Sequence, residues 1–292
     1  MRVGFAAVDI TPDIGSEIPG GFSPRISTGI HDPLQARACV VEGDDGPLLA
    51  FVGVDAVWVQ GVTVAAARDL ACAQTGLRER DICIAASHTH CGGPSHSVLG
   101  TEADGEYMDL LAKGISDAVV RAAGERVRAE LVEATADCSG WAFNRRWVMP
   151  DGSHRTNPGK RNSDVLHPAG PVDPELRTLA FRAEDGEWLG AVANFTCHST
   201  VMWGNEFSAD YAGYWRRALA ERTGNDAFCM VFLNGACGDI NQLDFSNPDV
   251  QESGGEWGER MGAALADCAW GAMSREAENE LQASTCGSAH GA

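Results

Sequence analysis

Short apolar runs alternate with amphipathic segments along most of the chain, and their order predicts the secondary structure. The opening segment MRVGFAAVDI has the composition of a strand, and the pair Thr11-Pro12 ends it. Residues 36–42 and 47–54 are two further strands across a Gly-containing turn, which predicts a β-hairpin. The second of these is apolar throughout, as expected of a strand covered on both faces.

A helix and another strand follow this hairpin. Residues 59–74 place apolar side chains at i, i+3 and i+4 spacing, which predicts an amphipathic helix that ends at Gly76. The run DICIAAS then predicts a short buried strand that ends just before His88. Strand, helix and strand in this order predict a right-handed βαβ unit with two parallel strands.

The rest of the chain gives a comparable series of elements. A second helix is expected over Gly105–Gly124 and a half-buried strand over residues 126–136. Residues 141–174 are rich in turn signals and predict a long irregular loop, a length typical of functional segments. Beyond it we expect a hairpin of the runs LRTLAFRAE and WLGAVANFTCH, a helix over residues 210–222 and a buried strand AFCMVFLNG.

These elements define the expected fold class and organisation. They predict an α/β protein with a mixed, largely buried β-sheet, flanked by helices, and a site at the carboxyl ends of the strands. No internal repeat and no Pro/Ser-rich linker divides the chain. We therefore expect one α/β domain over residues 1–250, and a C-terminal part over residues 251–292 with a helix at Trp257–Met273 and a loose tail.

Composition and charge exclude several classes of protein. Hydrophobic residues make up 44% of the 292 residues, as in globular proteins, and no apolar run reaches the ~18 residues of a membrane helix. The net charge of −19 would repel phosphate backbones and anionic headgroups, so a nucleic-acid partner is not expected. The opening segment lacks the apolar region of a secretory signal, which favours a cytoplasmic protein.

The ten cysteines are spread along the chain, and many lie inside apolar runs. In such positions cysteine behaves as a small hydrophobic residue, so reduced, structural thiols are expected. No C-x-x-C pair occurs, which gives a zinc site of the finger type no support.

Three of the buried strands end in clusters of polar and small residues: SHTHCGGP after the first, NFTCH at the end of the second and NGACGDIN after the third. Ligands of open α/β sheets bind outside the carboxyl ends of the strands. The three clusters are therefore expected to line one crevice.

Histidines in two of these clusters have a spacing that suits a metal ion. His88 and His90 lie two residues apart and face the same side if the strand continues, and His198 ends another buried strand. Imidazole suits zinc, and a catalytic zinc ion keeps three protein ligands. Candidates to complete the shell are Asp210 with the adjacent Tyr211, and Asp239. The alternatives are a pair of hydrogen-bonding loop histidines and, for Asp210, a helix N-cap.

Six segments, taken in order, carry a resemblance to a known family. The run SHTHCGGP resembles the Thr-His-Thr-His-Ser-Gly-Pro segment of the neutral/alkaline, non-lysosomal ceramidases, and GIHDPLQARA, Asn144-Arg145-Arg146 and NFTCHSTVM are similar to three further segments of theirs. SADYAGY is similar to their Ser-Gly-Asp-x-x-Gly-Tyr, and NGACGDIN to their Asn-Val-Gly-Asp-x-Ser-Pro-Asn. The resemblance covers about residues 3 to 245.

The resemblance implies a zinc-dependent hydrolase that cleaves the amide bond of a ceramide or another small N-acyl compound. It makes His88 and His198 zinc ligands, and it places His90 and Arg145 at the substrate carbonyl, where they would stabilise an oxyanion. The remaining zinc ligands of the family, a Glu and a Tyr, have no counterpart here. Two hypotheses follow: an enzyme with a substitute ligand such as Asp210, or a catalytically incomplete protein that binds metal or ligand without turnover.

A third hypothesis is a metal-free hydrolase with Cys91 or Cys197 as nucleophile, since each adjoins a histidine in sequence. Neighbours on a strand face opposite ways, which weakens it. Two residues keep two interpretations: His31 could line the site or form a turn, and Arg146 could grip the substrate beside Arg145 or lie in solvent. The remaining histidines are expected at the surface, namely His96, His154, His167 and His290.

Overall fold

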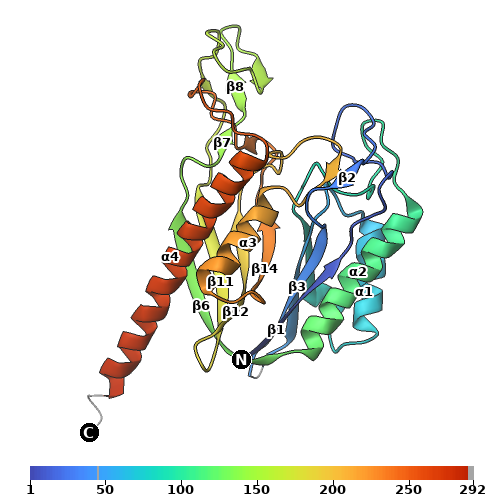
Figure 1. Ribbon diagram of the computed structural model, residues 1–292. Helices are drawn as coiled ribbons and strands as arrows, with labels where there is room; N and C mark the ends of the chain where they lie inside the picture. The colour runs from blue at the N-terminus through green and yellow to red at the C-terminus, as the bar shows by residue number, and fades with distance from the viewer. Residues whose placement is uncertain (45, 289–292) are drawn as a thin grey trace.

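The computed structural model describes residues 1–44 and 46–288, and a mixed eight-stranded sheet forms its centre (Figure 1). The strand order is β14-β12-β11-β6-β1-β3-β4-β5. In chain order the strands are β1 (Arg2–Asp9), β3 (Gln35–Glu42), β4 (Leu48–Val54), β5 (Ile82–Ala86), β6 (Val127–Asp137), β11 (Glu175–Ala183), β12 (Trp188–Phe195) and β14 (Cys229–Asn234). Within this sheet, only the pairs β4–β5 and β12–β14 are parallel.

The sheet folds over on itself, so that its two halves face each other. Strand β14 at one end of the order contacts β3 and β4 in the other half. The two halves approach closely, because a Cβ added at Gly53 in β4 would lie 2.4 Å from the carbonyl oxygen of Phe232 in β14. Apolar side chains such as Phe181 and Val231 fill the space between the halves.

Helices cover the two outer faces of the folded sheet (Figure 1). They are α1 (Gly61–Cys72), α2 (Gly105–Gly124), α3 (Tyr211–Thr223) and α4 (Gly255–Ser288), with a short 3-10 turn η1 (Glu79–Asp81) before β5. Helix α2 packs on β1 and β3 with α1 beside it, whereas α3 contacts β14 and α4 contacts β6 and β11. The result is four layers, helices outside and strands inside. None of the described helices is long and apolar enough to cross a membrane.

Most of the predicted elements are confirmed. The hairpins β3–β4 and β11–β12, the parallel pair β4–β5 and the helices α1, α2 and α3 lie where the sequence pattern places them. The α/β class, with a mixed sheet between helices, is confirmed as well. Nine of the ten cysteines, from Cys39 to Cys268, are free thiols, as expected.

Two expectations were wrong. Residues 141–174 are not wholly irregular: β8 (Arg146–Val148), β9 (His154–Thr156) and β10 (His167–Pro168) form a small sheet that projects at one end of the molecule (Figure 1). Strands of two or three residues are too short to show a period in the sequence. The expected loose tail is helical as far as Ser288, because its Ala/Glu-rich residues favour helix. His290 lies outside the described residues.

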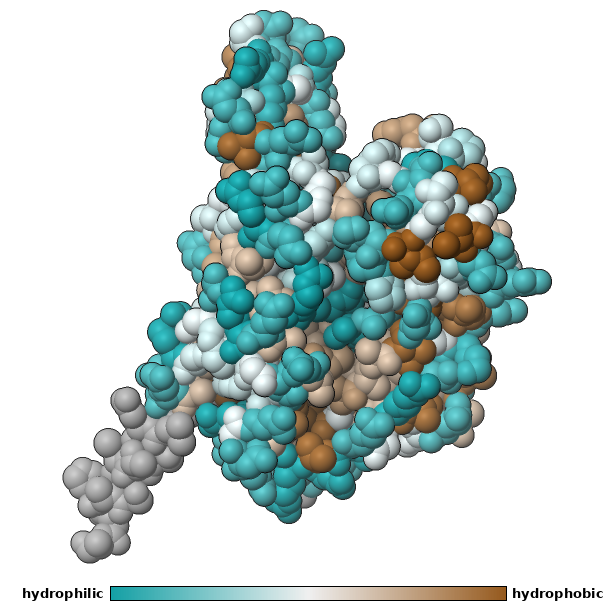
Figure 2. All heavy atoms as spheres, viewed as in Figure 1, coloured by the Kyte–Doolittle hydropathy of each residue, from teal (hydrophilic) through white to brown (hydrophobic). Residues whose placement is uncertain are grey.

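Four two-residue strands complete the structure. They are β2 (Gly29–Ile30), β7 (Phe143–Asn144), β13 (Glu206–Phe207) and β15 (Ile240–Asn241). They pair as β13–β2 and β15–β7, which ties the loops at the carboxyl ends of the parallel strands to one another. The face of the molecule shown in Figure 2 is mostly hydrophilic, in line with the high charge.

Candidate metal centre

Three histidines from two loops meet beyond the carboxyl ends of β5 and β12. The ligand atoms of His88, His90 and His198 all lie within 4.8 Å of one another. The Nε2 atom of His88 is 3.1 Å from that of His198 and 3.4 Å from that of His90. The structure therefore gives His90 the same place in the cluster as the two histidines expected to bind metal.

Each of these rings is held by a backbone carbonyl on its other nitrogen. The Nδ1 atoms of His88 and His90 lie 2.8 Å from the oxygens of Val57 and Gly20, and that of His198 lies 2.9 Å from the oxygen of Cys237. A carbonyl oxygen only accepts, so each Nδ1 carries the proton and donates it. In the neutral ring the lone pair is then on Nε2, which faces the other two rings.

Three lone pairs directed at one another repel unless a cation lies between them. Zinc binds imidazole nitrogen at ~2.0–2.1 Å, so two nitrogens on a tetrahedral zinc ion lie roughly 3.3 Å apart. The two measured Nε2 separations, 3.1 and 3.4 Å, bracket that value. Carbonyl acceptors on the far nitrogens are the usual outer partners of metal-binding histidines. The residues present thus fit a zinc ion.

The electrostatic surroundings keep the three imidazoles neutral. Burial, with smaller contributions from the neighbouring histidines, lowers the pKa of His90 to about 3. Burial also lowers the pKa of His198 to about 4 and reduces that of His88. Only the neutral ring has a lone pair for a metal, so these histidines are ready to bind one at neutral pH.

Local backbone conformation aims the rings. Strand β5 ends at Ala86, and His88 adopts the left-handed conformation, with a φ of 67°. Gly20, with a φ of 95°, passes close to His90, since a Cβ there would lie 2.8 Å from the Nδ1 atom. The space around the anchored ring therefore requires glycine at position 20.

Gly20→Ala is expected to weaken zinc binding by about 10- to 100-fold, the usual effect of disturbing an outer partner of a metal ligand. Competition with a chelator of known affinity measures this. Gly140→Ala is the matched control: Gly140 has a similar φ of 90°, but an added Cβ would meet nothing within 4 Å. If both variants bind zinc like the wild type, the carbonyl anchor of His90 has no role.

Two polar side chains hold the two histidine loops together. Asn234, at the end of β14, donates hydrogen bonds to the oxygens of Ser87 and Cys197, both at 2.9 Å. The Ser199 hydroxyl donates to the same Ser87 oxygen at 2.7 Å. Sequence analysis placed Asn234 in the site without a role and missed Ser199. The signal for Asn234 was a polar residue at the end of an apolar strand. Ser199 had no such signal.

Arg145 lies near this cluster, as expected. Its Nε and Nη2 atoms donate to the oxygen of Gly238 at 3.2 and 2.7 Å, in the same turn as the Cys237 carbonyl that anchors His198. Its positive charge is close enough to depress the pKa of both His88 and His198. Arg146, in contrast, is exposed and bonds His154 at 3.3 Å, so its interpretation as a surface residue is confirmed.

The structure does not support Asp210 as a metal ligand. Its carboxylate caps α3 by accepting from Tyr211 N at 2.7 Å, and it also accepts from Val201 N and Met202 N at 3.3 and 2.8 Å. These three backbone donors use both oxygens, and the side chain is fully buried away from the histidines. The N-cap interpretation is the one the structure supports.

The other two candidates are also engaged elsewhere. The hydroxyl of Tyr211 donates to Cys197 O at 3.0 Å, and the carboxylate of Asp239 accepts from Asn144 at 2.9 Å. Across the described part of the chain, only His88, His90 and His198 form a group with the spacing of metal ligands.

We expect Asp210→Asn to leave the zinc content of the purified protein unchanged, because the side chain caps a helix and does not face the histidines. Metal analysis of both proteins after identical purification tests this. A large loss of zinc in the variant, with an unchanged circular dichroism spectrum, would restore Asp210 to the shell.

Asp210 should also make stability depend on pH. Burial raises its pKa from 3.8 to about 7, so between these values the folded protein holds a proton that the unfolded chain has released. The stabilisation that comes from this bound proton is complete below pH 3.8 and is lost as the pH rises to about 7. The free energy of unfolding of the wild type, relative to Asp210→Asn, is expected to fall between about pH 4 and pH 7 in urea titrations. A constant difference would contradict the raised pKa.

The cysteine hypothesis is wrong. Cys91 and Cys197 are buried, with 2% and 0% of their surface exposed. Burial raises the pKa of Cys91 to about 12 and that of Cys197 well above its ordinary value. Both side chains therefore stay protonated at neutral pH, and the thiol is a poor nucleophile.

The remaining histidines lie outside the cluster. His31 is hydrogen-bonded through Nε2 to the hydroxyl of Tyr214 at 2.7 Å. His154 and His167 are exposed, as expected. His96 differs from the expectation, because it is half-buried and stacked on Trp58 with ring centroids 5.4 Å apart.

A cavity of about 290 Å³ adjoins the histidines. Its apolar side comes from the loop after β4, from β5 and from α1: Val57, Trp58, Val59, Ile84, Ala86 and Val64. His88 and Cys237 lie on its polar side.

Arg25 also contacts the cluster, although its sequence context did not single it out. It donates to the His90 carbonyl, and its guanidinium lies over the ring of Trp203, 4.3 Å from the centroid.

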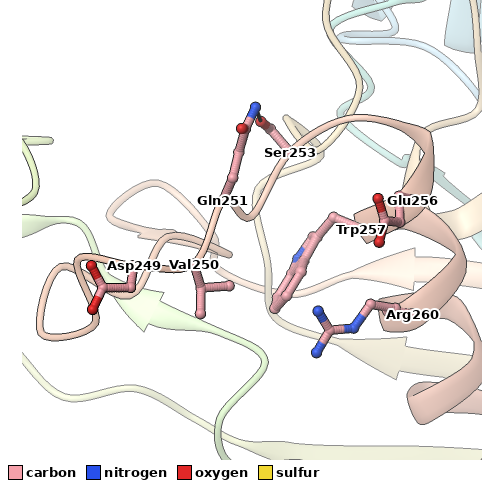
Figure 3. Close-up of a pocket in the computed structure, with 7 residues that line it drawn as sticks. All are labelled: Asp249, Val250, Gln251, Ser253, Glu256, Trp257 and Arg260. Carbon is pink, nitrogen blue, oxygen red and sulfur yellow. Dashed lines mark hydrogen bonds between the residues drawn. The ribbon is translucent and has the colours of Figure 1, made fainter.

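Another cavity, of about 400 Å³, lies at the start of α4 (Figure 3). There the Arg260 guanidinium lies over the ring of Trp257, 4.8 Å from its centroid. This cavity shares no residue with the histidine cluster, so we do not assign it to the metal centre.

The chain is similar in sequence to proteins of a known family. The N-terminal part of the neutral/alkaline non-lysosomal ceramidase family matches residues 1–253. The chain is 27% identical to the neutral ceramidase of Pseudomonas aeruginosa over 259 residues, and 25% identical to that of Drosophila melanogaster over 276 residues. These matches cover 82% and 87% of this chain but 37% and 38% of the relatives, so it spans about two fifths of their length.

The fold is shared as well. The crystal structure of the Pseudomonas aeruginosa neutral ceramidase superposes with a TM-score of 0.78 at 21% identity, over 94% of this chain and 45% of the other. The match over residues 1–253 shows that the chain belongs to the neutral/alkaline non-lysosomal ceramidase family.

Proposed function

We propose that this protein is a zinc-dependent hydrolase of N-acyl amide bonds, with the metal held by His88, His90 and His198. The observation that carries the proposal is the convergence of three unprotonated Nε2 atoms, each fixed by a carbonyl on the other nitrogen. Membership in the ceramidase family supports the reaction class. Zinc, when bound, would polarise a carbonyl and lower the pKa of water.

The protein's own residues supply binding and orientation. The guanidinium of Arg145 uses two nitrogens on Gly238, and its Nη1 has no hydrogen-bond partner among the described residues. This nitrogen could donate to a substrate carbonyl oxygen, where a planar, fixed donor stabilises developing negative charge. The apolar side of the cavity beside His88 suits the hydrocarbon part of an acyl group.

A second candidate function is metal or ligand binding without turnover. It is favoured by one observation: in the described ranges no carboxylate or thiol joins the three histidines. Against it, three protein ligands are the usual number for a catalytic zinc ion.

One experiment separates the two. The zinc-loaded protein is incubated with a soluble N-acyl amine and with ceramide in mixed micelles, and released amine is measured, with His88→Ala as the control. Zinc-dependent release of amine supports the hydrolase. A full zinc load with no release from either substrate supports the binding protein, and a protein that takes up no zinc contradicts both.

A further inference from the structure

A cavity lined by three arginines and three carboxylates lies on the side of the molecule, between β3 and α3, and shares no residue with the metal centre. It has a volume of about 400 Å³, within the range of small-ligand sites. Gln35 and Arg37 come from β3, and Gly213, Arg216 and Arg217 come from α3. Figure 2 shows a hollow with strongly hydrophilic walls where these two elements pass each other.

Two guanidinium groups lie in its floor, and the one carboxylate beside them pairs with only one of them. Arg216, 8% exposed, pairs through Nη2 with Asp55, 3% exposed, at 2.8 Å. Arg37 makes no ion pair within the described ranges: its Nε donates to the amide oxygen of Gln35 at 2.8 Å, and its Nη1 lies 3.7 Å from the sulfur of Cys229. Burial keeps the pKa of the Cys229 thiol raised, so it brings no charge. The floor therefore has one positive charge in excess.

The unused donors of these arginines face the cavity. Arg216 donates a single hydrogen bond, and neither arginine has a nitrogen that is both buried and unpartnered. Their remaining N–H groups must therefore reach solvent. Arg216 is 8% exposed and lines this cavity, so its free N–H groups reach solvent through the cavity. Two planar groups with free donors match the oxygens of a phosphate or carboxylate.

The acidic residues in the lining of the cavity make no ion pair with Arg37 or Arg216 in the described ranges, so they leave the free donors of both arginines unused. Asp32 is occupied, since it accepts from Ser208 Oγ at 2.6 Å and from Ala209 N at 2.7 Å. Glu221 and Asp226 are exposed at the mouth, where water screens them. Arg217 is paired with Glu259 at 2.6 Å. We propose that Arg37 and Arg216 form a binding site for a small oxyanion, a phosphate or carboxylate group.

The test titrates the zinc-loaded wild type with sodium phosphate and, separately, with sodium acetate, each against sodium chloride at matched ionic strength. A specific site gives a saturable rise in the melting temperature, about 2–6 °C at ten times the dissociation constant. The stronger of the two responses identifies the source of the oxyanion. No saturable response to either anion, beyond that of chloride, would overturn the proposal.

Variants locate the response. Arg37→Gln is expected to weaken the anion response at least tenfold, because it removes the guanidinium that lacks an anionic partner. Arg146→Gln, at an exposed arginine outside the cavity, is the control and should respond like the wild type. An unchanged response in a folded Arg37→Gln protein would contradict the site.

If Arg37→Gln does not fold, a measurement on the wild type alone tests the site. The Nε–Hε resonances of Arg37 and Arg216 in the wild-type nuclear magnetic resonance spectrum are expected to shift on addition of the anion, and that of Arg146 is not. Static resonances of Arg37 and Arg216 at saturating anion would contradict the site.

Discussion

Replacement of His88 by alanine is expected to strip the protein of zinc and to abolish the proposed hydrolytic activity. The Nε2 atom of His88 lies within 3.4 Å of both other Nε2 atoms, so its loss opens the centre of the cluster. We expect the zinc affinity to fall by more than ~100-fold, since loss of even an outer partner of a ligand costs about 10- to 100-fold. Metal analysis and a chelator competition measure the change.

The control is His154→Ala, which removes an exposed histidine outside the cluster and should keep the full zinc load. His198→Ala should behave like His88→Ala. Undiminished zinc in both cluster variants would show that the metal binds elsewhere.

Arg145→Lys is expected to lower kcat/KM by ~10- to 1000-fold while the zinc content stays the same. The guanidinium bonds Gly238 through two nitrogens and still has Nη1 for a substrate, a combination that one ammonium group cannot reproduce. Steady-state kinetics on the zinc-loaded protein, with Arg146→Lys as the control, measure the effect.

Two results would change the role of Arg145. Equal kcat/KM in variant and wild type would make it an ordinary loop residue. Loss of zinc together with activity would instead show that Arg145 acts through the turn at Cys237, whose carbonyl holds the His198 ring.

The sequence predicted the elements that have long regular patterns. Helix α2 has 20 residues, about five and a half turns, with one apolar side, and its bounds agree with the prediction. The sequence also showed that β4 is covered on both faces, yet it did not reveal that the covering on one side is β14 of the same sheet. Apolar residues indicate burial, and they do not identify the partner.

The metal centre was predicted for a reason that is only partly correct. His88 and His90 were expected to share a face because the strand would continue, whereas β5 ends at Ala86 and His88 turns left-handed. The carbonyls of Val57 and Gly20 bring the rings together instead. Such long-range anchors leave no periodic signal in the sequence.

Asp210 shows a different kind of ambiguity. A carboxylate at the start of a helix suits a cap and a metal equally, and only the positions of the backbone donors decide between them. Arg37 and Asp55 were not singled out at all, because a charged residue beside an apolar strand resembles a solvated end until the fold buries it.

The most direct test of the account is X-ray absorption at the zinc edge of the zinc-loaded protein. Three histidines with anchored Nδ1 atoms predict a shell with three imidazole nitrogens at ~2.0–2.1 Å, one zinc ion per chain, and one imidazole fewer in His90→Ala. A shell with sulfur ligands at ~2.3 Å, or a shell unchanged in His90→Ala, would contradict a metal held by His88, His90 and His198.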